Sequence, residues 1–318
     1  MPIEGENKMI SLNGETIEPG QRKLVRIKIA RLPTGTLIDI PIHVFNGEKP
    51  GPTVLVQAGL HGDEINGVET LRRMLHKDSF NITHGAVIVV PVLNVFGFIH
   101  FSRDVPDGKD VNRSFPGRKT GSLASRIAHA YTTNVLPSVD FGIDLHTGGG
   151  QRHNYPQVRY TEDDPRSREL AKFFGAPFYF PSRLIKGSFR KTTFKMGIPS
   201  IVYEGGESMR FDEEAIDHGI QGIQNVFTAL GMLPDDPLKK NNSIVLTNSR
   251  WIRAPKAGMF VPQVKNGQQV GKGNVLGLVT DPYTKKDKKV KAPFEGFIFC
   301  INHQAVVNQG DALFHLGS

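Results

Sequence analysis

One pair of residues, His61 and Glu64, has the types and the spacing of metal ligands. The pair lies in the sequence HGDE at 61–64, directly after an apolar run that is typical of a buried strand. Imidazole and carboxylate groups bind zinc well, and a catalytic zinc commonly has three protein ligands and one open position. The third ligand should come from another strand end, and His146 in the sequence IDLHTGG is the candidate. We therefore predict one zinc ion per chain, bound by His61, Glu64 and His146.

The remaining histidines have no comparable setting. His153 is near His146 in the sequence, but it falls in a polar stretch that we interpret as a loop. We interpret the others as surface or core residues.

A metal-activated water needs a base, and Glu204 is the candidate. It lies at the end of the apolar segment SIVYEGG (200–206), so it marks a further strand end that is followed by two glycines. A carboxylate there can take a proton from water whose pKa zinc has lowered to about 7. A lone loop glutamate is usually just solvated, but the repetition of strand ends favours a functional role. Glu207 is the alternative base.

Four polar residues between positions 103 and 113 are suited to bind the substrate or to support the reaction. Asn112 and Arg113 lie in the sequence DVNR at 110–113. A guanidinium group binds a carboxylate through two hydrogen bonds, and the Asn112 amide offers donors beside it. Asp110 is suited to hold the other ring nitrogen of a ligand histidine. Arg103 is suited to stabilise the charge that develops on a carbonyl oxygen.

Alternating strands and helices must position these residues. Segments 22–31 and 36–45 alternate apolar and polar residues around Pro33, Thr34 and Gly35, which predicts an antiparallel hairpin. The predicted buried strands are 53–59, 85–94, 139–146 and 200–206, and the predicted helices are 66–76, 122–136, 167–175 and 213–231. This order predicts an α/β fold with a mixed, mainly parallel sheet flanked by helices, with ligands bound where the strands end.

The pattern changes near residue 233. Segment 233–242 is rich in proline and charge, which predicts a linker, and short strands punctuated by glycine follow it. We expect a larger domain at 1–235, which includes the N-terminal hairpin, and a small all-β domain at 243–318. The basic run 285–291 is interpreted as a solvated loop.

The composition excludes several classes of protein. The chain has 318 residues, of which 38% are hydrophobic and 22% are charged, and this rules out a fibrous or wholly disordered chain. No apolar run approaches the roughly 20 residues that cross a bilayer, and the N-terminus lacks the apolar region of a secretory signal. The single cysteine, Cys300, excludes an internal disulfide and a multi-cysteine metal site. We expect a cytoplasmic protein.

The net charge of +8 suits several kinds of anionic partner. No nucleic-acid motif accompanies it, and we expect neither a nucleic-acid nor a membrane partner. If the protein is retained on heparin without sequence preference and is released at modest salt, its binding through this charge is nonspecific.

Four motifs in one order make a specific resemblance. They are HGDE at 61–64, DVNR at 110–113, DLHTG at 144–148 and YEGG at 203–206. In this respect the chain resembles the succinylglutamate desuccinylase/aspartoacylase family of carboxypeptidase A-like zinc hydrolases. The motifs cover roughly residues 50–210, and the resemblance implies the family fold over 1–235.

The resemblance also implies roles for single residues. His61, Glu64 and His146 would bind zinc, and Glu204 would be the general base or acid. Residues matching Asn112 and Arg113 hold the substrate carboxylate in the family, and Arg103 resembles the arginine that polarises the scissile carbonyl.

Two features of the family have no firm counterpart in this sequence. Tyr283 is a candidate for the substrate-binding tyrosine by its rough location alone. Arg159, Arg183 and Arg190 are all candidates for a second arginine that reads an acidic acyl group.

The C-terminal region resembles a biotinyl/lipoyl-type barrel-sandwich domain. The stretch from Ala254 to Gly277 matches its first half, and segments around 290–298 and 308–317 match its second half. The lysine-bearing hairpin between the halves is replaced by DPYTKKDKKVKAP, without the carrier signature. We therefore expect a structural role or a role in capping the site.

These observations predict a zinc-dependent amidohydrolase. It would remove an N-acyl group, such as acetyl or succinyl, from a small amino-acid derivative by means of metal-activated water. The alternatives are a zinc carboxypeptidase that acts on short peptides and a catalytically inactive small-molecule binding protein. The sequence is also compatible with a homo-oligomer.

Overall fold

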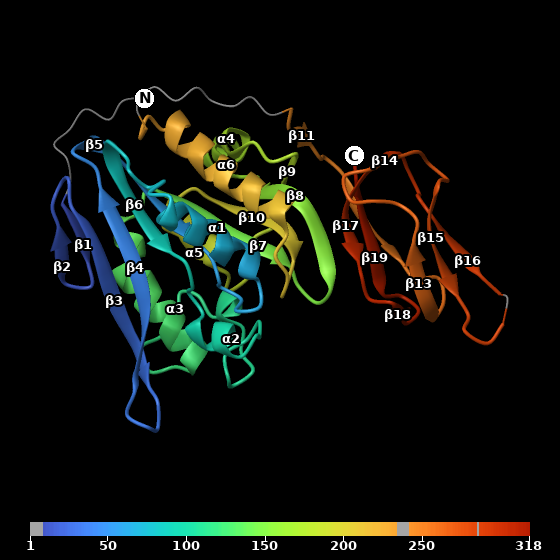
Figure 1. The fold of residues 1–318 in the computed structure, drawn as a ribbon, viewed down its shortest axis with the longest axis horizontal. Coiled ribbons are helices and arrows are strands. Elements are labelled where there is room, and N and C mark those ends of the chain that lie inside the picture. The colour runs from blue at the N-terminus through green and yellow to red at the C-terminus, as the bar shows by residue number, and fades with distance from the viewer. Residues whose placement is uncertain (1–8, 234–241, 285) are drawn as a thin grey trace.

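The computed structural model describes residues 9–233, 242–284 and 286–318. A long mixed sheet forms the centre of the molecule (Figure 1). The strands of the main body are β1 (Ile10–Leu12), β2 (Glu15–Ile17), β3 (Arg22–Arg31), β4 (Leu37–Asn46), β5 (Lys49–Gln57), β6 (His84–Val90), β7 (Phe141–Gly148), β8 (Arg152–Tyr160), β9 (Phe178–Pro181) and β10 (Ser200–Glu207). The helices are α1 (Ile65–His76), α2 (Val95–Ile99), α3 (Leu123–Asn134), α4 (Pro165–Phe174), α5 (Phe189–Lys195) and α6 (Glu213–Ala229), with short 3-10 turns at Val111–Arg113 and Leu136–Ser138.

The middle of the sheet is parallel. Strands β6, β5, β7 and β10 lie side by side in this order and pair in parallel, whereas β3 and β4 form an antiparallel hairpin at one edge. The parallel strands are continuous apolar runs because helices cover both of their faces. The predicted α/β fold with a mixed sheet flanked by helices is therefore confirmed.

Two apolar clusters lie on opposite faces of this sheet. One packs helices α1, α4 and α6 through residues such as Leu71, Leu170 and Ile223. The other packs α3 and α5 through Ile127 and Phe189. The strands between them are thus held rigidly, and residues at their ends have fixed positions.

The strands and helices predicted in the main body are present, with ends that differ by a few residues. The predicted helix 122–136, for example, is observed as α3, and the predicted strand 139–146 as β7. The interpretation of the segment around His153 as a loop is wrong, because β8 begins at Arg152 and pairs with β10. The sequence RHNYPQVRY lacks a continuous apolar run, so this strand was not anticipated, and neither were β9, α2 and α5.

The C-terminal part is built from short strands. They are β11 (Ile244–Val245), β12 (Ser249–Arg253), β13 (Gly258–Pro262), β14 (Gln269–Val270), β15 (Val275–Thr280), β16 (Lys288–Lys291), β17 (Gly296–Asn302), β18 (Val306–Val307) and β19 (Ala312–Gly317). Strand β17 pairs with β8, so the main sheet continues into this part, while β16, β15, β13 and β18 form a second sheet. An apolar cluster that includes Phe260, Leu276 and Phe314 lies within the C-terminal part.

Two predictions about this region have different outcomes. Residues 234–241 of the predicted linker lie outside the described residues, and the division into domains at 1–235 and 243–318 stays a prediction. The basic run 285–291 is not a loop throughout, because Lys288–Lys291 forms β16, with Val290 buried between exposed lysines. Lys285 lies outside the described residues.

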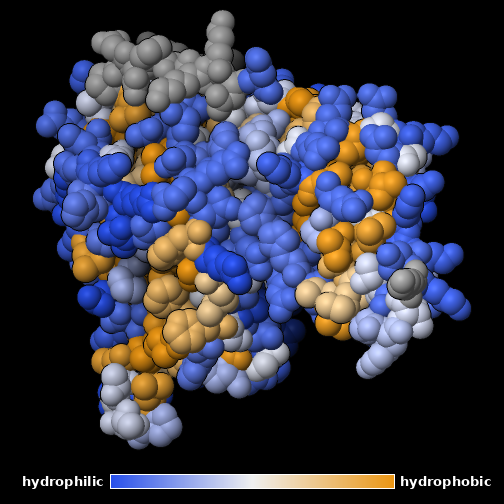
Figure 2. Space-filling view, turned by 45° about the vertical axis from the view of Figure 1, so that its right-hand side comes forward, coloured by the Kyte–Doolittle hydropathy of each residue, from blue (hydrophilic) through white to orange (hydrophobic). Residues whose placement is uncertain are grey.

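The molecular surface is largely hydrophilic, with local apolar patches (Figure 2). On the C-terminal part the exposed apolar side chains include Met259, Val261 and Val306. Among the helices that the structure describes, none is long and apolar enough to cross a membrane.

Candidate active site

The predicted metal ligands and the predicted base lie at the carboxyl ends of neighbouring parallel strands. His61 and Glu64 follow β5, and Glu64 is the residue that precedes the first turn of α1. His146 and Glu204 are directly opposite each other in the register of β7 and β10. This pairing explains why two strand ends far apart in the sequence deliver their side chains to one place, as open α/β sheets commonly do.

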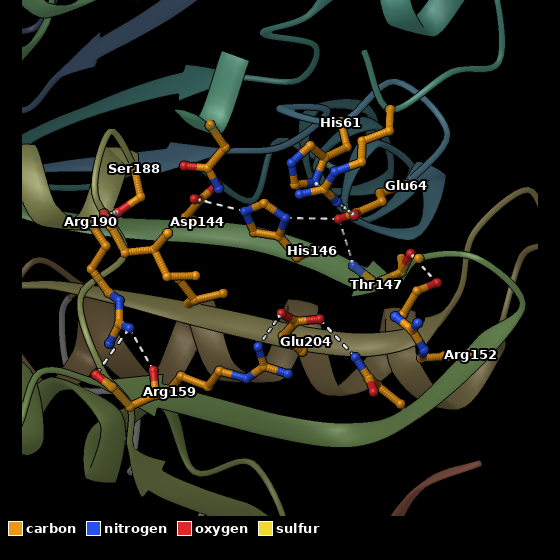
Figure 3. Close-up of a pocket in the computed structure, with 18 of the residues that line it drawn as sticks. His61, Glu64, Asp144, His146, Thr147, Arg152, Arg159, Ser188, Arg190 and Glu204 are labelled. Atoms are coloured by element: carbon orange, nitrogen blue, oxygen red, sulfur yellow. Dashed lines mark hydrogen bonds and ion pairs between the residues drawn. The ribbon is translucent and has the colours of Figure 1, made fainter. Parts of the chain in front are cut away.

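His61, Glu64 and His146 form one compact buried cluster (Figure 3). Their ligand atoms lie within 4.8 Å of one another, and all three side chains are at most 5% exposed. Oε1 of Glu64 is 2.7 Å from Nδ1 of His61, and Oε2 is 2.8 Å from Nδ1 of His146. The backbone N–H of Thr147 donates to the same Oε2 at 3.0 Å. Both imidazoles therefore present Nδ1 to a common point.

The turn that carries His61 and Glu64 depends on a close approach of two backbones. A Cβ atom on Gly62 would lie 1.8 Å from the carbonyl carbon of Gly97 in α2. Only glycine fits there, so α2 fixes the position of the loop between the two predicted ligands.

Carboxylates face the far side of both imidazoles. Nε2 of His146 is 2.8 Å from Oδ2 of Asp144, and Nε2 of His61 is 3.4 Å from Oδ1 of Asp110. Asp144 is held in turn by the side chain of Gln57, which donates to its Oδ1 at 3.0 Å. This is the arrangement that orients metal-binding histidines, because the proton stays on the nitrogen that faces the carboxylate.

Asp144 was not anticipated as a site residue. It precedes His146 by two residues on the same strand, and side chains two apart in a strand point to the same face. That spacing is the signal that identifies it.

The electrostatics of the cluster suit a cation. Burial favours the neutral form of Glu64, but the neighbouring imidazoles of His61 and His146 outweigh it and hold the pKa of this carboxyl well below its usual range. Burial opposes the charged form of His146, yet Asp144 and Glu64 raise the pKa of this imidazole well above its usual value. The buried carboxylates therefore stabilise positive charge on the imidazoles, and a bound metal ion would supply that charge in place of the protons.

The donor set also fits a metal by its hydrogen bonding. Nδ1 of His61 faces both the acceptor Glu64 and the donor Arg103, whose Nη1 is 3.2 Å away. Nε2 of His61 is buried and has no hydrogen-bond partner at normal geometry among the described residues. Nδ1 cannot donate to Glu64 and accept from Arg103 at the same time. A cation bound to Nδ1 would remove the need for a proton there and leave the proton on Nε2, which faces Asp110.

Glu204 lies in the same cavity, and two polar side chains hold it. Its Oε2 accepts a hydrogen bond from Nδ2 of Asn154 at 2.7 Å, and its Oε1 is 3.0 Å from Nη1 of Arg159. Both partners come from β8, the strand that pairs with β10. Glu204 is 9% exposed, so its carboxylate is fixed in direction and shielded from bulk water.

Arg103 and Asp110 form a unit beside the cluster. Nε and Nη2 of Arg103 donate to Oδ2 of Asp110 at 3.1 and 2.9 Å, while Nη1 lies 3.5 Å from Oε1 of Glu64. Partial burial raises the pKa of the Asp110 carboxyl, but His61 and Arg103 outweigh it and hold this pKa below its usual range. The guanidinium of Arg103 is therefore aimed at the cluster.

Asn112 and Arg113 line the cavity on the side of α5. The Asn112 side-chain oxygen accepts from the backbone N–H of Phe189 at 2.9 Å, which leaves its amide donors available. Arg113 donates to the backbone oxygen of Asn112 at 2.7 Å and lies 3.8 Å from Asp110. Much of this guanidinium is open to a ligand, since 43% of its side chain is exposed.

The cavity has a volume of about 810 Å³, and six arginines line it. They are Arg103, Arg113, Arg152, Arg159, Arg183 and Arg190. A cavity of this size suits a small molecule rather than a folded partner.

Arg190 has a structural role within this wall. Its guanidinium donates to the backbone oxygens of Tyr160, Ser182 and Arg183 and to the hydroxyl of Ser182. Burial and the neighbouring Arg159 lower the pKa of Arg190 to about 10. These bonds fix the loop that presents Arg183 to the cavity.

Three residues outside these segments remain to be placed. Tyr283 is 94% exposed and does not line the cavity, so the suggestion that it is the substrate-binding tyrosine is wrong. Trp251 of β12 does line it, and no sequence pattern indicated this. Cys300 is buried, and burial raises the pKa of its thiol to about 12, which makes it an unreactive core residue.

Comparisons with known proteins agree with this arrangement. Residues 50–230 match the model of the succinylglutamate desuccinylase/aspartoacylase catalytic domain. The N-alpha-acetyl-L-2,4-diaminobutyric acid deacetylase of Halomonas elongata is 29% identical over 86% of this chain and 84% of its own length.

Solved structures have the same fold. A succinylglutamate desuccinylase/aspartoacylase from Rhodobacter sphaeroides is 26% identical, with a TM-score of 0.81 over 93% of this chain and 95% of that one. The product-bound ectoine utilization protein EutE of Ruegeria pomeroyi is 23% identical, with a TM-score of 0.83 over 97% of both chains. The matched segment contains the whole His61, Glu64, His146 and Glu204 constellation. This chain is thus a member of the succinylglutamate desuccinylase/aspartoacylase family.

Proposed function

We propose that this protein is a zinc-dependent amidohydrolase that removes an N-acyl group from a small amino-acid derivative. The observation that supports this most strongly is the buried cluster of His61, Glu64 and His146, with the fixed carboxylate of Glu204 in the same cavity. Membership of a family named for a desuccinylase and an acylase favours amide cleavage over the peptide trimming of a carboxypeptidase.

His61, Glu64 and His146 are the residues that would hold the ion. Two imidazoles and a carboxylate are a common zinc set, and they leave one position open. When bound, zinc would supply Lewis-acid activation of water and of the amide carbonyl. Asp110 and Asp144 keep the two imidazoles in the tautomer that frees Nδ1.

Glu204 would move the proton. Its carboxylate is aimed into the cavity by Asn154 and Arg159, so it can accept a proton from water and later deliver it to the departing nitrogen. Arg159 holds the carboxylate in place, because the ion pair is close and partly buried.

Arg103, Asn112 and Arg113 would handle the substrate. Arg103 is fixed by Asp110 with one guanidinium nitrogen directed at the cluster, where it can stabilise a developing oxyanion. Arg113 and the free amide donors of Asn112 are suited to a substrate carboxylate. Water is restricted near Glu64, His146 and Glu204 by their burial, which strengthens each of these interactions.

A panel of substrates tests the proposal. N-acetyl-, N-succinyl- and N-formyl-amino acids are assayed for amine release, before and after removal of metal and after addition of zinc, with short peptides as the alternative. We expect amine release from at least one N-acyl amino acid, loss with a chelator and recovery with zinc. Turnover of peptides alone would favour a carboxypeptidase, and binding without turnover would favour an inactive binding protein.

A further inference from the structure

A second cavity lies behind helix α5. It has a volume of about 530 Å³, which is within the usual range for small-molecule sites. Its walls are formed by the loop at Phe115 and Pro116, by helix α3, and by helix α5 with the residues at either end of it. None of the described residues that line it also lines the active-site cavity. The second cavity is therefore separate from the site described above.

Helix α5 stands between the two cavities. Ser188 and Arg190, at the start of the helix, line the active-site cavity (Figure 3). Lys191 and Lys195 are four residues apart on the helix, so they share a face, and both line the second cavity. The helix thus presents different faces to the two cavities.

The loop that follows Arg113 forms the rest of the partition. Asn112 and Arg113 line the active-site cavity, whereas Phe115, two residues further on, lines the second one. The backbone N–H of Phe115 donates to the backbone oxygen of Gly187 at 2.9 Å, and its ring packs edge-on against Phe189, with centroids 5.7 Å apart. Because these contacts fix the partition, the second cavity can hold a ligand while the active site holds a substrate.

The second cavity is strongly basic. Lys186, Lys191 and Lys195 line it, and no Asp or Glu is among its described lining residues. In the part of the chain that the structure describes, none of these three ammonium groups has an ion pair or a hydrogen bond. Lys191 and Lys195 repel each other, because like charges four residues apart on a helix are neighbours. A bound anion would offset this repulsion.

The rest of the wall is apolar, apart from one unpaired hydroxyl. Phe115, Pro116 and Met196 supply the apolar surface. The hydroxyl of Thr132 is buried and has no hydrogen-bond partner among the described residues. Buried polar groups normally have a partner, so this hydroxyl is suited to an oxygen of a ligand or of an ordered water. The cavity therefore combines positive charge, apolar surface and a hydrogen-bonding group.

We propose that this cavity is a second binding site, and that its ligand is a small organic phosphate. The three ammonium groups would contact the phosphate, and the organic part would pack on Phe115, Pro116 and Met196. Lysine is a compact point charge that suits phosphate, whereas the arginines of the active-site cavity suit the planar carboxylate. This inference goes beyond the proposed function, because binding here needs neither zinc nor turnover.

Phenyl phosphate is the probe for this site, because it joins a phosphate to an apolar ring. Calorimetry measures its binding to the purified protein beside two relatives. Inorganic phosphate lacks the ring, and benzoate has the ring but only a single charge. We expect phenyl phosphate to bind several-fold more tightly than either, and its binding to weaken as the salt concentration rises.

Variants of the wall locate the binding. Lys191→Gln/Lys195→Gln should raise the Kd of phenyl phosphate by roughly tenfold, because two of the three ammonium groups are lost. Lys265→Gln/Lys272→Gln lowers the net charge equally outside the cavity and is the matched control. Met196→Gln should weaken phenyl phosphate and leave inorganic phosphate within about twofold. Thermal unfolding checks the fold of each variant, and Lys195→Gln alone, at an exposed position, repeats the test with less effect on the helix.

Several outcomes would overturn this assignment. An unchanged Kd in the Lys191→Gln/Lys195→Gln variant, or an equal loss in its control, would show that the cavity does not bind the probe. A loss in Arg113→Gln with the lysine variant unchanged would place the probe in the active-site cavity. Benzoate binding as tightly as phenyl phosphate would contradict the phosphate class. None of these results depends on amide hydrolysis, so the proposed function is tested separately.

Discussion

Replacing Glu204 by glutamine should separate catalysis from structure. Glutamine keeps the length of the side chain, but it cannot accept a proton from water. The turnover number should fall by about 10²–10⁴-fold, the usual contribution of a positioned general base. This fall corresponds to about 2.7–5.4 kcal/mol of transition-state stabilisation.

The structure indicates a much smaller effect on folding. The Glu204 carboxylate has two contacts, at 2.7 Å to Asn154 and at 3.0 Å to Arg159. Glutamine can keep its oxygen towards Arg159, and the amide of Asn154 can turn to accept from the new NH₂ group. The ion pair is lost, but the Arg159 side chain is 31% exposed, and partly solvated pairs contribute about 1 kcal/mol or less. The expected fall in Tm is roughly 2–4 °C.

The assay measures initial rates of amine release, zinc content and thermal unfolding of the same preparation. Glu207→Gln is the matched control, since Glu207 lies on the same strand but faces His303, 2.8 Å away, outside the cavity. Zinc content should be unchanged in both variants. Near-normal turnover in Glu204→Gln together with a collapse in Glu207→Gln would refute the reasoning and identify Glu207 as the base.

Three further substitutions test the surroundings of the cluster. Asp144→Asn weakens the acceptor for Nε2 of His146 and should lower zinc affinity by about 10–100-fold in a chelator competition. Arg113→Lys should weaken binding of substrates with a free carboxylate by about 1.5–3 kcal/mol, with a smaller loss for their methyl esters; equal losses with a lowered Tm would indicate a structural role. Arg190→Met leaves buried carbonyl oxygens without donors and should lower the free energy of unfolding by about 2–4 kcal/mol in urea, and an unchanged midpoint would contradict the structural role.

The sequence predicted the centre of the site because strand ends leave a clear pattern. Apolar runs that stop at a histidine or a glutamate, followed by glycine, indicated His61, His146 and Glu204. Parallel pairing of β7 and β10 then brings the last two together, as the structure shows. The family resemblance implied roles for the residues between them.

The walls of the cavity could not be predicted in this way. Asn154 and Arg159 lie on β8, whose inward positions are polar because they face the cavity, so hydrophobic periodicity fails there. Trp251 reaches the cavity only because β17 pairs with β8 and brings the C-terminal strands alongside the main body. Contacts of this kind depend on tertiary packing and leave no local signal.

The most direct test of the central claim is the metal content of the purified protein and of two variants, His61→Ala and His146→Ala. The account predicts one zinc per chain in the wild type and little in either variant, because two remaining ligands hold the ion poorly. Circular dichroism should show that the fold is retained, and zinc should restore activity to metal-stripped wild type alone. Retention of one zinc per chain by both variants would contradict the assignment of this cluster as the metal site.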